Sequence, residues 1–294
     1  MVTKCGIIRY RPKTNSLNST HMKKKMRILI CLLGLVSVNL TYGHYPVSPY
    51  AFCNGNPVNF VDPNGMEIEE SSMKDWEKEK ASIQRIMDKI QNQINKLVAK
   101  AGSKSRIANL VDRISGLNST METMGQLEAS TQMYALASVG AGELGGLSYN
   151  HGTGIVTISY GGTANFVHEV THGGQFEAGE IAFMPPKIIG QDVYDEIAAY
   201  KAQYAYDPLS VSGLTSSSPV RSSDDITGFW VQGLVYNGIT PYGPGGSANT
   251  GIAPIGVNSN RDALIRAYPH LRQVLQSMPA NITLRRLRGV YYKR

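Results

Sequence analysis

The chain has 294 residues, of which 42% are hydrophobic, so it can bury a substantial core in one large domain or two smaller ones. Its formal net charge of +7 arises from residues 1–44, which contain eight basic residues and no acidic one, whereas the rest of the chain holds 21 basic and 22 acidic residues. A nearly neutral body excludes overall charge as an argument for a nucleic-acid partner. The three cysteines, Cys5, Cys31 and Cys53, are too few for a disulfide framework or a thiolate metal cluster.

Residues 1–44 are interpreted as a leader with a signal-peptide-like segment at 22–43. This segment begins with Met-Lys-Lys-Lys-Met-Arg, continues as an apolar run at 28–38 and ends in a short polar stretch. The pattern is typical of a bacterial export signal, whereas a membrane span needs about 20 apolar residues. We therefore expect translation to start at Met22, cleavage near 41–44, no stable membrane span and a secreted, extracellular protein. A buried core segment is the alternative interpretation.

Residues 45–66 are rich in Pro, Asn and Gly, as expected for a turn-rich segment. The run SPYAFCNGNPVN at 48–59, followed by DPNGM at 62–66, resembles the signature that closes the RHS-repeat core of bacterial polymorphic toxins. No such repeats stand before it in this sequence. The resemblance implies that 45–66 is a junction, that a toxin or effector module follows it, and that self-cleavage would fall after Met66. It also implies a cognate immunity protein as a partner.

Residues 67–123 are predicted to be a helical region. Apolar residues at three- and four-residue steps predict a helix at 70–101, capped by Ser71 or Ser72 and ended by Gly102. A second helix is expected at 105–117. We expect the two to form an antiparallel hairpin packed on a catalytic module, with a partner-binding coiled coil as the alternative.

Residues 124–140 are expected to add a further helical segment, and 145–160 a β-hairpin around the turn Asn-His-Gly-Thr-Gly. The second arm, 155–160, is expected to be an edge strand to which substrate backbone can add. His151 lies in the turn and is expected at the surface. Further on, we expect a loop at 209–225, a core helix at 225–236, a long loop at 241–260 and a final helix at 264–275.

The sequence His-Glu-Val-Thr-His at 168–172 is an H-E-x-x-H motif, on a helix expected to begin near 163–165 and to end at Gly173 and Gly174. Two histidines four residues apart lie on one helix face, within reach of a single ion. The motif therefore predicts His168 and His172 as ligands of Zn²⁺ and Glu169 as the general base of a hydrolase.

A catalytic zinc site usually has a third protein ligand. A metzincin would have a histidine six residues after His172, but Ala178 stands there. Glu196 is the best candidate because it lies 24 residues after His172 in an Ala-rich helical stretch that resembles the second metal helix of gluzincins. Asp192 and Asp195 are the competing carboxylates.

Other groups are expected to assist the reaction. Tyr200 is the predicted donor to the oxyanion and Tyr204 is a second candidate, although for both tyrosines core packing is the favoured alternative. Gln175 and Asp195 are candidate hydrogen-bond partners of the ligand imidazoles.

Together these features predict an α+β fold, with a zincin-like metallopeptidase core at 124–294 preceded by a helical hairpin. The expected function is zinc-dependent hydrolysis of peptide bonds in a protein or peptide substrate, in an RHS-type toxin. The alternatives are a catalytically inactive zinc-containing binding module and a non-peptidase zinc amidohydrolase that acts on cell-wall amides.

Overall fold

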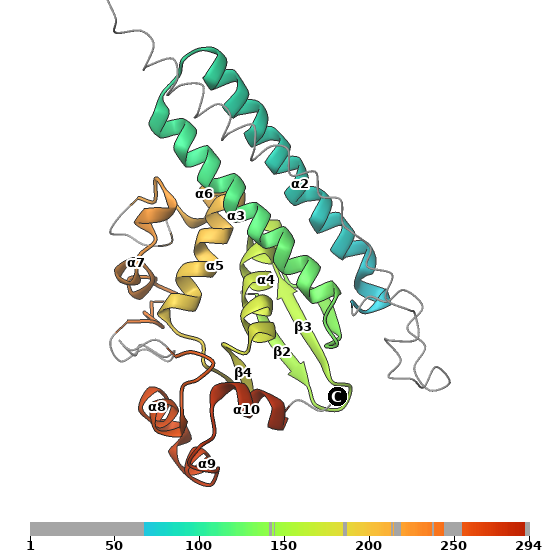
Figure 1. The fold of residues 1–294 in the computed structure, drawn as a ribbon, viewed down its shortest axis with the longest axis vertical. Helices are drawn as coiled ribbons and strands as arrows, with labels where there is room; N and C mark the ends of the chain where they lie inside the picture. Colours follow the sequence, from blue (N-terminus) through green and yellow to red (C-terminus); the bar gives the residue numbers. More distant parts are fainter. Residues whose placement is uncertain are drawn as a thin grey trace, which may run out of the picture. The chain divides into compact units, whose positions relative to one another are not determined.

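The computed structural model describes residues 68–140, 143, 145–184, 187–212, 214, 219–236, 238–243 and 255–291. All of them belong to one compact unit, Asp62–Arg294. The predicted leader at 1–44, its signal-peptide-like segment and the junction at 45–66 lie outside the described residues. The described part is α+β, as predicted, with many helices and two small sheets (Figure 1).

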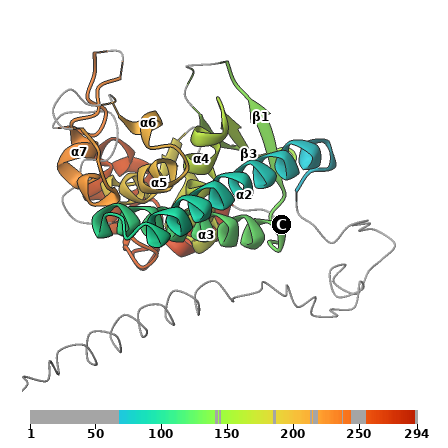
Figure 2. The same cartoon turned by 90° about the horizontal axis from the view of Figure 1, so that it is seen from above.

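The predicted helical hairpin is formed by α2 (Glu70–Ala99) and α3 (Lys104–Glu128), which lie side by side (Figure 1, Figure 2). α2 has nearly the predicted bounds because its apolar stripe packs inward. Four members of this stripe are buried: Trp76, Ile83, Ile90 and Ile94. α3 spans the predicted boundary at 123/124 and packs on α4 and α5.

The N-terminal cap predicted for α2 is wrong. The helix begins after Glu69, whose side chain makes no capping hydrogen bond. Ser71 Oγ donates to the Glu69 carboxylate, and Ser72 Oγ accepts from the N–H of Leu136 at 2.8 Å. Ser72 therefore joins α2 to the sheet instead of capping the helix.

The helical segment predicted at 124–140 is correct only as far as Glu128, and residues 134–138 form a strand instead. α3 continues to Glu128 because Thr120, Met124 and Leu127 extend its buried stripe beyond the predicted end at 117. The chain then enters β1 (Tyr134–Ser138), whose parallel pairing with β3 outweighs the helical spacing of its apolar residues.

The main sheet has the strand order β1-β3-β2. β2 (Gly146–Asn150) and β3 (Ile155–Tyr160) are antiparallel and form the predicted hairpin. Asn150 closes the turn, because its Oδ1 accepts from the N–H groups of Gly152 and Thr153. The edge-strand prediction needs correction: the arm at 155–160 is the central strand, and β2 is the edge.

Two adjacent helices follow the sheet, α4 (Thr163–Ala178) and α5 (Val193–Tyr206) (Figure 1). α4 begins where predicted but does not end at Gly173 and Gly174; it ends at Gly179, whose φ of 81° is left-handed. The two internal glycines allow close packing against α3. A Cβ at Gly173 would lie 3.1 Å from Leu127 Cδ1, and one at Gly174 would lie 2.6 Å from Thr123 Cγ2.

The remaining elements are short: β4 (Ala182–Met184), β5 (Lys187–Ile189), α6 (Pro208–Val211), α7 (Gly228–Gln232), α8 (Arg261–Ala267), α9 (Arg272–Gln276) and α10 (Leu284–Tyr291). Of the core helix predicted at 225–236, only the five residues of α7 are α-helical. The helix predicted at 264–275 is broken, because Pro269 disfavours helical backbone in the residue before it. Residues of α8–α10 form their own hydrophobic cluster with β4 and β5. No helix within the described ranges is long and apolar enough to cross a membrane.

Candidate metal centre

The two histidines of the H-E-x-x-H motif point to the same place. α4 carries His168 and His172 one turn apart, and their Nε2 atoms lie 3.1 Å from each other. Both side chains are buried. Two ring nitrogens that face each other this closely in a buried site are arranged as ligands of one ion rather than as surface groups.

α5 brings Glu196 to the two histidines, as predicted. Glu196 Oε2 lies 3.6 Å from His168 Nε2, and Glu196 Oε1 lies 3.6 Å from His172 Nε2. These three residues are the only group of His, Cys, Asp or Glu side chains among the described residues that is arranged to hold a metal ion. The site can therefore bind a metal ion through two imidazoles and one carboxylate.

The competing carboxylates have other partners. Asp192 is the N-cap of α5 and accepts from the N–H groups of Tyr194 and Asp195. Asp195 completes the capping box by accepting from the Asp192 N–H at 2.8 Å. Both therefore fix the start of α5, one turn or less before Glu196, and thereby help to place that side chain.

A glutamine fixes the orientation of one imidazole. Gln175 Oε1 lies 2.7 Å from His172 Nδ1, so the ring donates from Nδ1 and its Nε2 faces the other ligands. Gln175 was predicted for this role. Asp195 contributes its backbone carbonyl rather than its carboxylate, because this carbonyl accepts from Gln175 Nε2 at 3.1 Å.

The two imidazoles differ in their electrostatics. Burial lowers the pKa of His168 well below its ordinary value, and the neighbouring His172 lowers it further. Burial alone would also lower the pKa of His172, but the carboxylates of Glu196 and Glu169 outweigh burial and raise this pKa. His168 is thus held neutral, which is the form that binds metals.

Glu169 lies beside the triad and is buried. Burial raises the pKa of its carboxyl group to about 7, with a further contribution from Glu196. Asn165 Nδ2 donates to Glu169 Oε1 at 3.1 Å, and Asn165 Oδ1 accepts from the Gly161 N–H at 2.9 Å. The backbone of Gly145 packs closely beside Glu169, since a Cβ at this glycine would lie 2.7 Å from Glu169 Oε1. The carboxyl group is therefore held in one position.

A cavity of about 300 Å³ opens over these groups. Apolar side chains form part of its wall, namely Leu147, Ile181, Ile188 and Leu214. β2 lies at its edge through Gly146 and Leu147. His151, in contrast, is exposed in the turn at the end of β2, as predicted.

Tyr200 lines the cavity, and Tyr204 does not. The Tyr200 ring packs edge-on against His168, with ring centroids 4.4 Å apart, and against Trp230 on another side. Burial, together with Glu196, raises the pKa of Tyr200 far above its ordinary value. Tyr204 instead donates its hydroxyl to the Arg221 carbonyl at 2.7 Å. Packing is thus the role of Tyr204.

Several residues at the site were not predicted from the sequence, among them Asn165 as the partner of Glu169, Gln191 and Gln203 as lining residues, and Tyr242, which hydrogen-bonds Glu196. Asn165 stands four residues before Glu169, a spacing that places the two on one helix face and could have shown the pair. Gln191 and Tyr242 come from segments between or beyond the helices. No local pattern marks them, because only the tertiary fold brings them to the triad.

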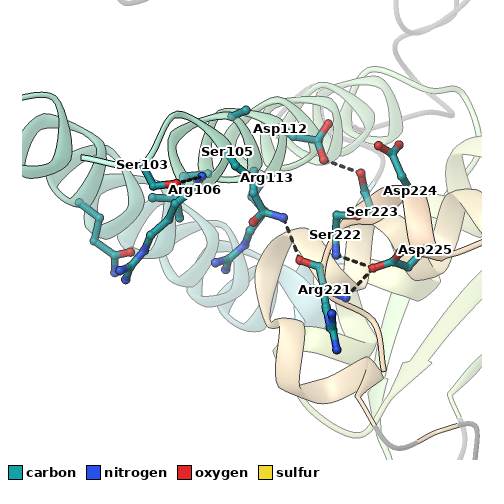
Figure 3. A pocket seen from close by; sticks show the side chains of 14 residues that line it. Ser103, Ser105, Arg106, Asp112, Arg113, Arg221, Ser222, Ser223, Asp224 and Asp225 are labelled. Carbon is teal, nitrogen blue, oxygen red and sulfur yellow. Dashed lines mark hydrogen bonds between the residues drawn. The ribbon is translucent and has the colours of Figure 1, made fainter. Parts of the chain in front are cut away.

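A second, larger cavity of about 900 Å³ lies between α3 and residues 221–225 (Figure 3). Its polar groups bind one another: Ser223 Oγ donates to Asp112 at 2.6 Å, and the Asp225 carboxylate accepts from the backbone N–H groups of Arg221 at 2.7 Å and Ser222 at 3.0 Å. The two backbone hydrogen bonds lower the pKa of Asp225. The Ser223–Asp112 hydrogen bond links residues 221–225 to α3, and none of the triad residues lines this cavity.

The geometry is thus that of a buried metal-binding triad with an acidic residue and an open cavity beside it. Comparisons of the chain with protein-family models, with curated proteins and with solved structures gave no match.

Proposed function

We propose that this protein is a zinc-dependent metallopeptidase with a zincin-like core. His168, His172 and Glu196 bind Zn²⁺, and Glu169 is the general base. The observation that carries the proposal is the buried triad with a fourth side chain, the carboxyl group of Glu169, held beside it. That fourth side chain serves hydrolysis rather than metal affinity, which favours an enzyme over a catalytically inactive binding module.

The spacing of the ligand atoms supports zinc. Two ligands at about 2.05 Å from a tetrahedral zinc ion lie about 3.3 Å apart. The two histidine Nε2 atoms lie 3.1 Å apart, and each lies 3.6 Å from a different oxygen of Glu196, Oε2 for His168 and Oε1 for His172. Glu196 Oε2 is also buried with no hydrogen-bond partner in the described part of the chain, a desolvation cost that a bound cation removes.

The chain's own residues fit a hydrolytic role. Bound zinc supplies a Lewis acid and lowers the pKa of its water. Glu169, whose pKa burial raises in the metal-free site, is placed to take the proton of the attacking water and deliver it to the leaving nitrogen. The hydroxyl of Tyr200 remains protonated near neutral pH and can donate to the oxygen of the scissile carbonyl.

The edge strand supports a peptide substrate over a small cell-wall amide. β2 ends the sheet and lines the cavity, so an extended peptide can pair with its free edge while its carbonyl reaches the triad. The resemblance at 48–66 to the RHS core signature supports an effector or toxin role for the module that follows it, and the pattern at 22–43 supports export. An immunity protein that covers the cavity is the partner that this role requires.

The experiment compares the full chain with three variants: Glu169→Gln, Glu196→Ala and, as a control on the same helix, Glu177→Gln. Glu177 lies outside the cavity and accepts from the Tyr134 hydroxyl. We expect one zinc per chain and casein hydrolysis in the wild type and the control. Glu169→Gln should keep zinc and lose activity, whereas Glu196→Ala should lose zinc.

Two results would contradict the proposal. A wild-type protein without zinc would remove the basis for an enzyme of this type. Bound zinc with no peptide hydrolysis, but with release of cell-wall fragments, would reassign the site to an amidohydrolase.

A further inference from the structure

Gln191 is in direct contact with the predicted metal ligands. Its Nε2 donates to Glu196 Oε1 at 2.5 Å and lies 3.4 Å from His172 Nε2. The two oxygens of Glu196 are therefore not equivalent. Oε1 accepts from Gln191, whereas Oε2 faces His168 and has no hydrogen-bond partner among the described residues.

The backbone of Gln191 is anchored by the C-terminal helices. The hydroxyl of Tyr268 accepts from the Gly190 N–H and donates to the Gln191 carbonyl, each at 2.9 Å. Gly190 has a φ of 96°, and a Cβ there would lie 2.7 Å from Leu284 Cδ2. The turn that carries Gln191 is thus held by the Tyr268 hydroxyl, and its close packing against Leu284 requires glycine at position 190.

These C-terminal helices contribute no residue to the cavity wall that the structure describes. Tyr268 and Leu284 belong to the hydrophobic cluster of α8–α10, and Tyr268 is only 6% exposed. A tyrosine hydroxyl that is held by such a cluster and binds two consecutive backbone groups restricts the position of Gln191. The contact chain therefore runs from Tyr268 through Gln191 to Glu196.

We propose that Gln191 is a positioning residue that orients Glu196 as a ligand through Oε2, and that Tyr268 holds Gln191 in place for this purpose. The inference rests on the metal site of the proposed function. A carboxylate with one oxygen occupied by a donor cannot rotate freely, so its other oxygen stays directed at the ion. Partners of this kind typically change metal affinity by roughly 10- to 100-fold.

Gln191 is not needed to start α5. Asp192 caps that helix, and it also accepts from the Ile255 N–H at 2.6 Å. Removal of the Gln191 amide should therefore leave α5 folded, although the metal-free protein loses one hydrogen bond to Glu196. A change in the Co²⁺ spectrum of a variant that is still folded distinguishes a positioning role from a structural one.

The test uses the full chain and measures the zinc dissociation constant by competition with a chromophoric chelator. The variants are Gln191→Met, which keeps the size but removes the donor, and Tyr268→Phe, which removes only the hydroxyl. Tyr204→Phe is the matched control, because its buried hydroxyl also binds a backbone carbonyl but lies outside the cavity. Thermal unfolding of each metal-free protein and the visible spectrum of the Co²⁺-loaded form are recorded alongside.

We expect Gln191→Met to weaken zinc binding by roughly 10- to 100-fold and Tyr268→Phe by a smaller factor, with about twofold or less for Tyr204→Phe. The Co²⁺ spectrum should change in the first two variants only. Because Tyr268 acts through Gln191, the double variant should bind zinc no more weakly than Gln191→Met alone.

The experiment distinguishes failure of the proposed function from failure of the inference on Gln191. No zinc in the wild type would overturn the proposed function and this inference together. Tight zinc binding in both the wild type and Gln191→Met would overturn the inference alone. Multiplicative losses in the double variant would show that Tyr268 acts independently of Gln191, and would also overturn it.

Discussion

The close approach of α3 to α4 predicts opposite effects for two formally identical substitutions. An ideal Cβ at Gly174 would lie 2.6 Å from Thr123 Cγ2, whereas a Cβ at Gly125 would meet nothing within 4 Å. Both glycines lie inside helices, so both gain helix propensity when replaced by alanine. We expect Gly125→Ala to stabilise the protein and Gly174→Ala to destabilise it.

The magnitudes follow from these contacts. Alanine is favoured over glycine in a helix interior by about 0.8–1 kcal/mol, and Gly125→Ala should gain roughly this amount. At Gly174 the same gain is opposed by overpacking, which costs about 1–3 kcal/mol. Thr123 cannot simply turn its methyl group away, because its Oγ1 donates to the Ser119 carbonyl at 3.0 Å. The two variants should therefore differ by about 1–3 kcal/mol.

The assay is urea-induced unfolding, with the free energy of unfolding extrapolated to water. A third variant, Thr123→Ser, removes Cγ2 and keeps the hydroxyl. In that background Gly174→Ala should become stabilising, with a coupling energy on the order of 1–3 kcal/mol. The reasoning is refuted if Gly174→Ala has the same effect in both backgrounds, or if it matches Gly125→Ala.

Three further predictions concern the site and its surroundings. Gly145→Ala should lower peptidase activity about 100-fold with zinc retained, because its Cβ would lie 2.5 Å from Asn165 Oδ1 and the Ser159 carbonyl oxygen and 2.7 Å from Glu169 Oε1, so that the Asn165–Glu169 pair must shift. Gly146→Ala, which meets nothing within 4 Å, should keep both properties, and equal activities would contradict this. Burial, aided by two acidic residues of α2, raises the pKa of Tyr160 to about 12, so the folded state holds this proton more tightly than the unfolded chain does. The resulting stability is complete below about pH 10 and is lost as the pH rises towards 12, and Tyr160→Phe should reduce the decline of the urea midpoint in this range. Zinc at about 100 times its dissociation constant should raise the free energy of unfolding by about 2.7 kcal/mol, reversibly with a chelator and not in Glu196→Ala.

The parts of the fold that could be predicted are those that local spacing determines. The apolar stripe of α2, the Asn-His-Gly-Thr-Gly turn between β2 and β3, and the H-E-x-x-H helix each depend on residues a few positions apart. The misplaced boundaries have tertiary causes. Gly173 and Gly174 resembled a helix end, but their missing side chains make room for α3. Residues 134–138 were expected to be helical, but pairing with β3 makes them a strand.

The candidate site also contains residues that local sequence predicts and residues that only the tertiary structure reveals. The pentapeptide at 168–172 predicts His168, Glu169 and His172 as site residues, and the distance of Glu196 from His172 along the chain predicts the third ligand. The Gln191 carbonyl, in contrast, accepts from the hydroxyl of Tyr268, 77 residues later. Such a contact leaves no periodic or compositional trace, so only the structure could reveal it.

The start of the folded unit gives a last prediction, which bears on the junction at 45–66. Ile68 is only 4% exposed and pairs in parallel with Tyr134, and the Glu69 N–H donates to the Tyr134 carbonyl at 2.8 Å. A chain that starts at Glu67, directly after the position that the RHS resemblance implies for cleavage, keeps both contacts. A chain that starts at Glu70 loses them.

The shorter chain should be less stable by about 2–4 kcal/mol, which combines the burial of one isoleucine with one hydrogen bond. Urea unfolding of the two chains measures this difference, and Ile68→Ala in the longer chain should reproduce about half of it or more. Equal stabilities would show that Ile68 does not belong to the core. A large difference would mean that cleavage a few residues after Met66 weakens the sheet on which the candidate metal site is built.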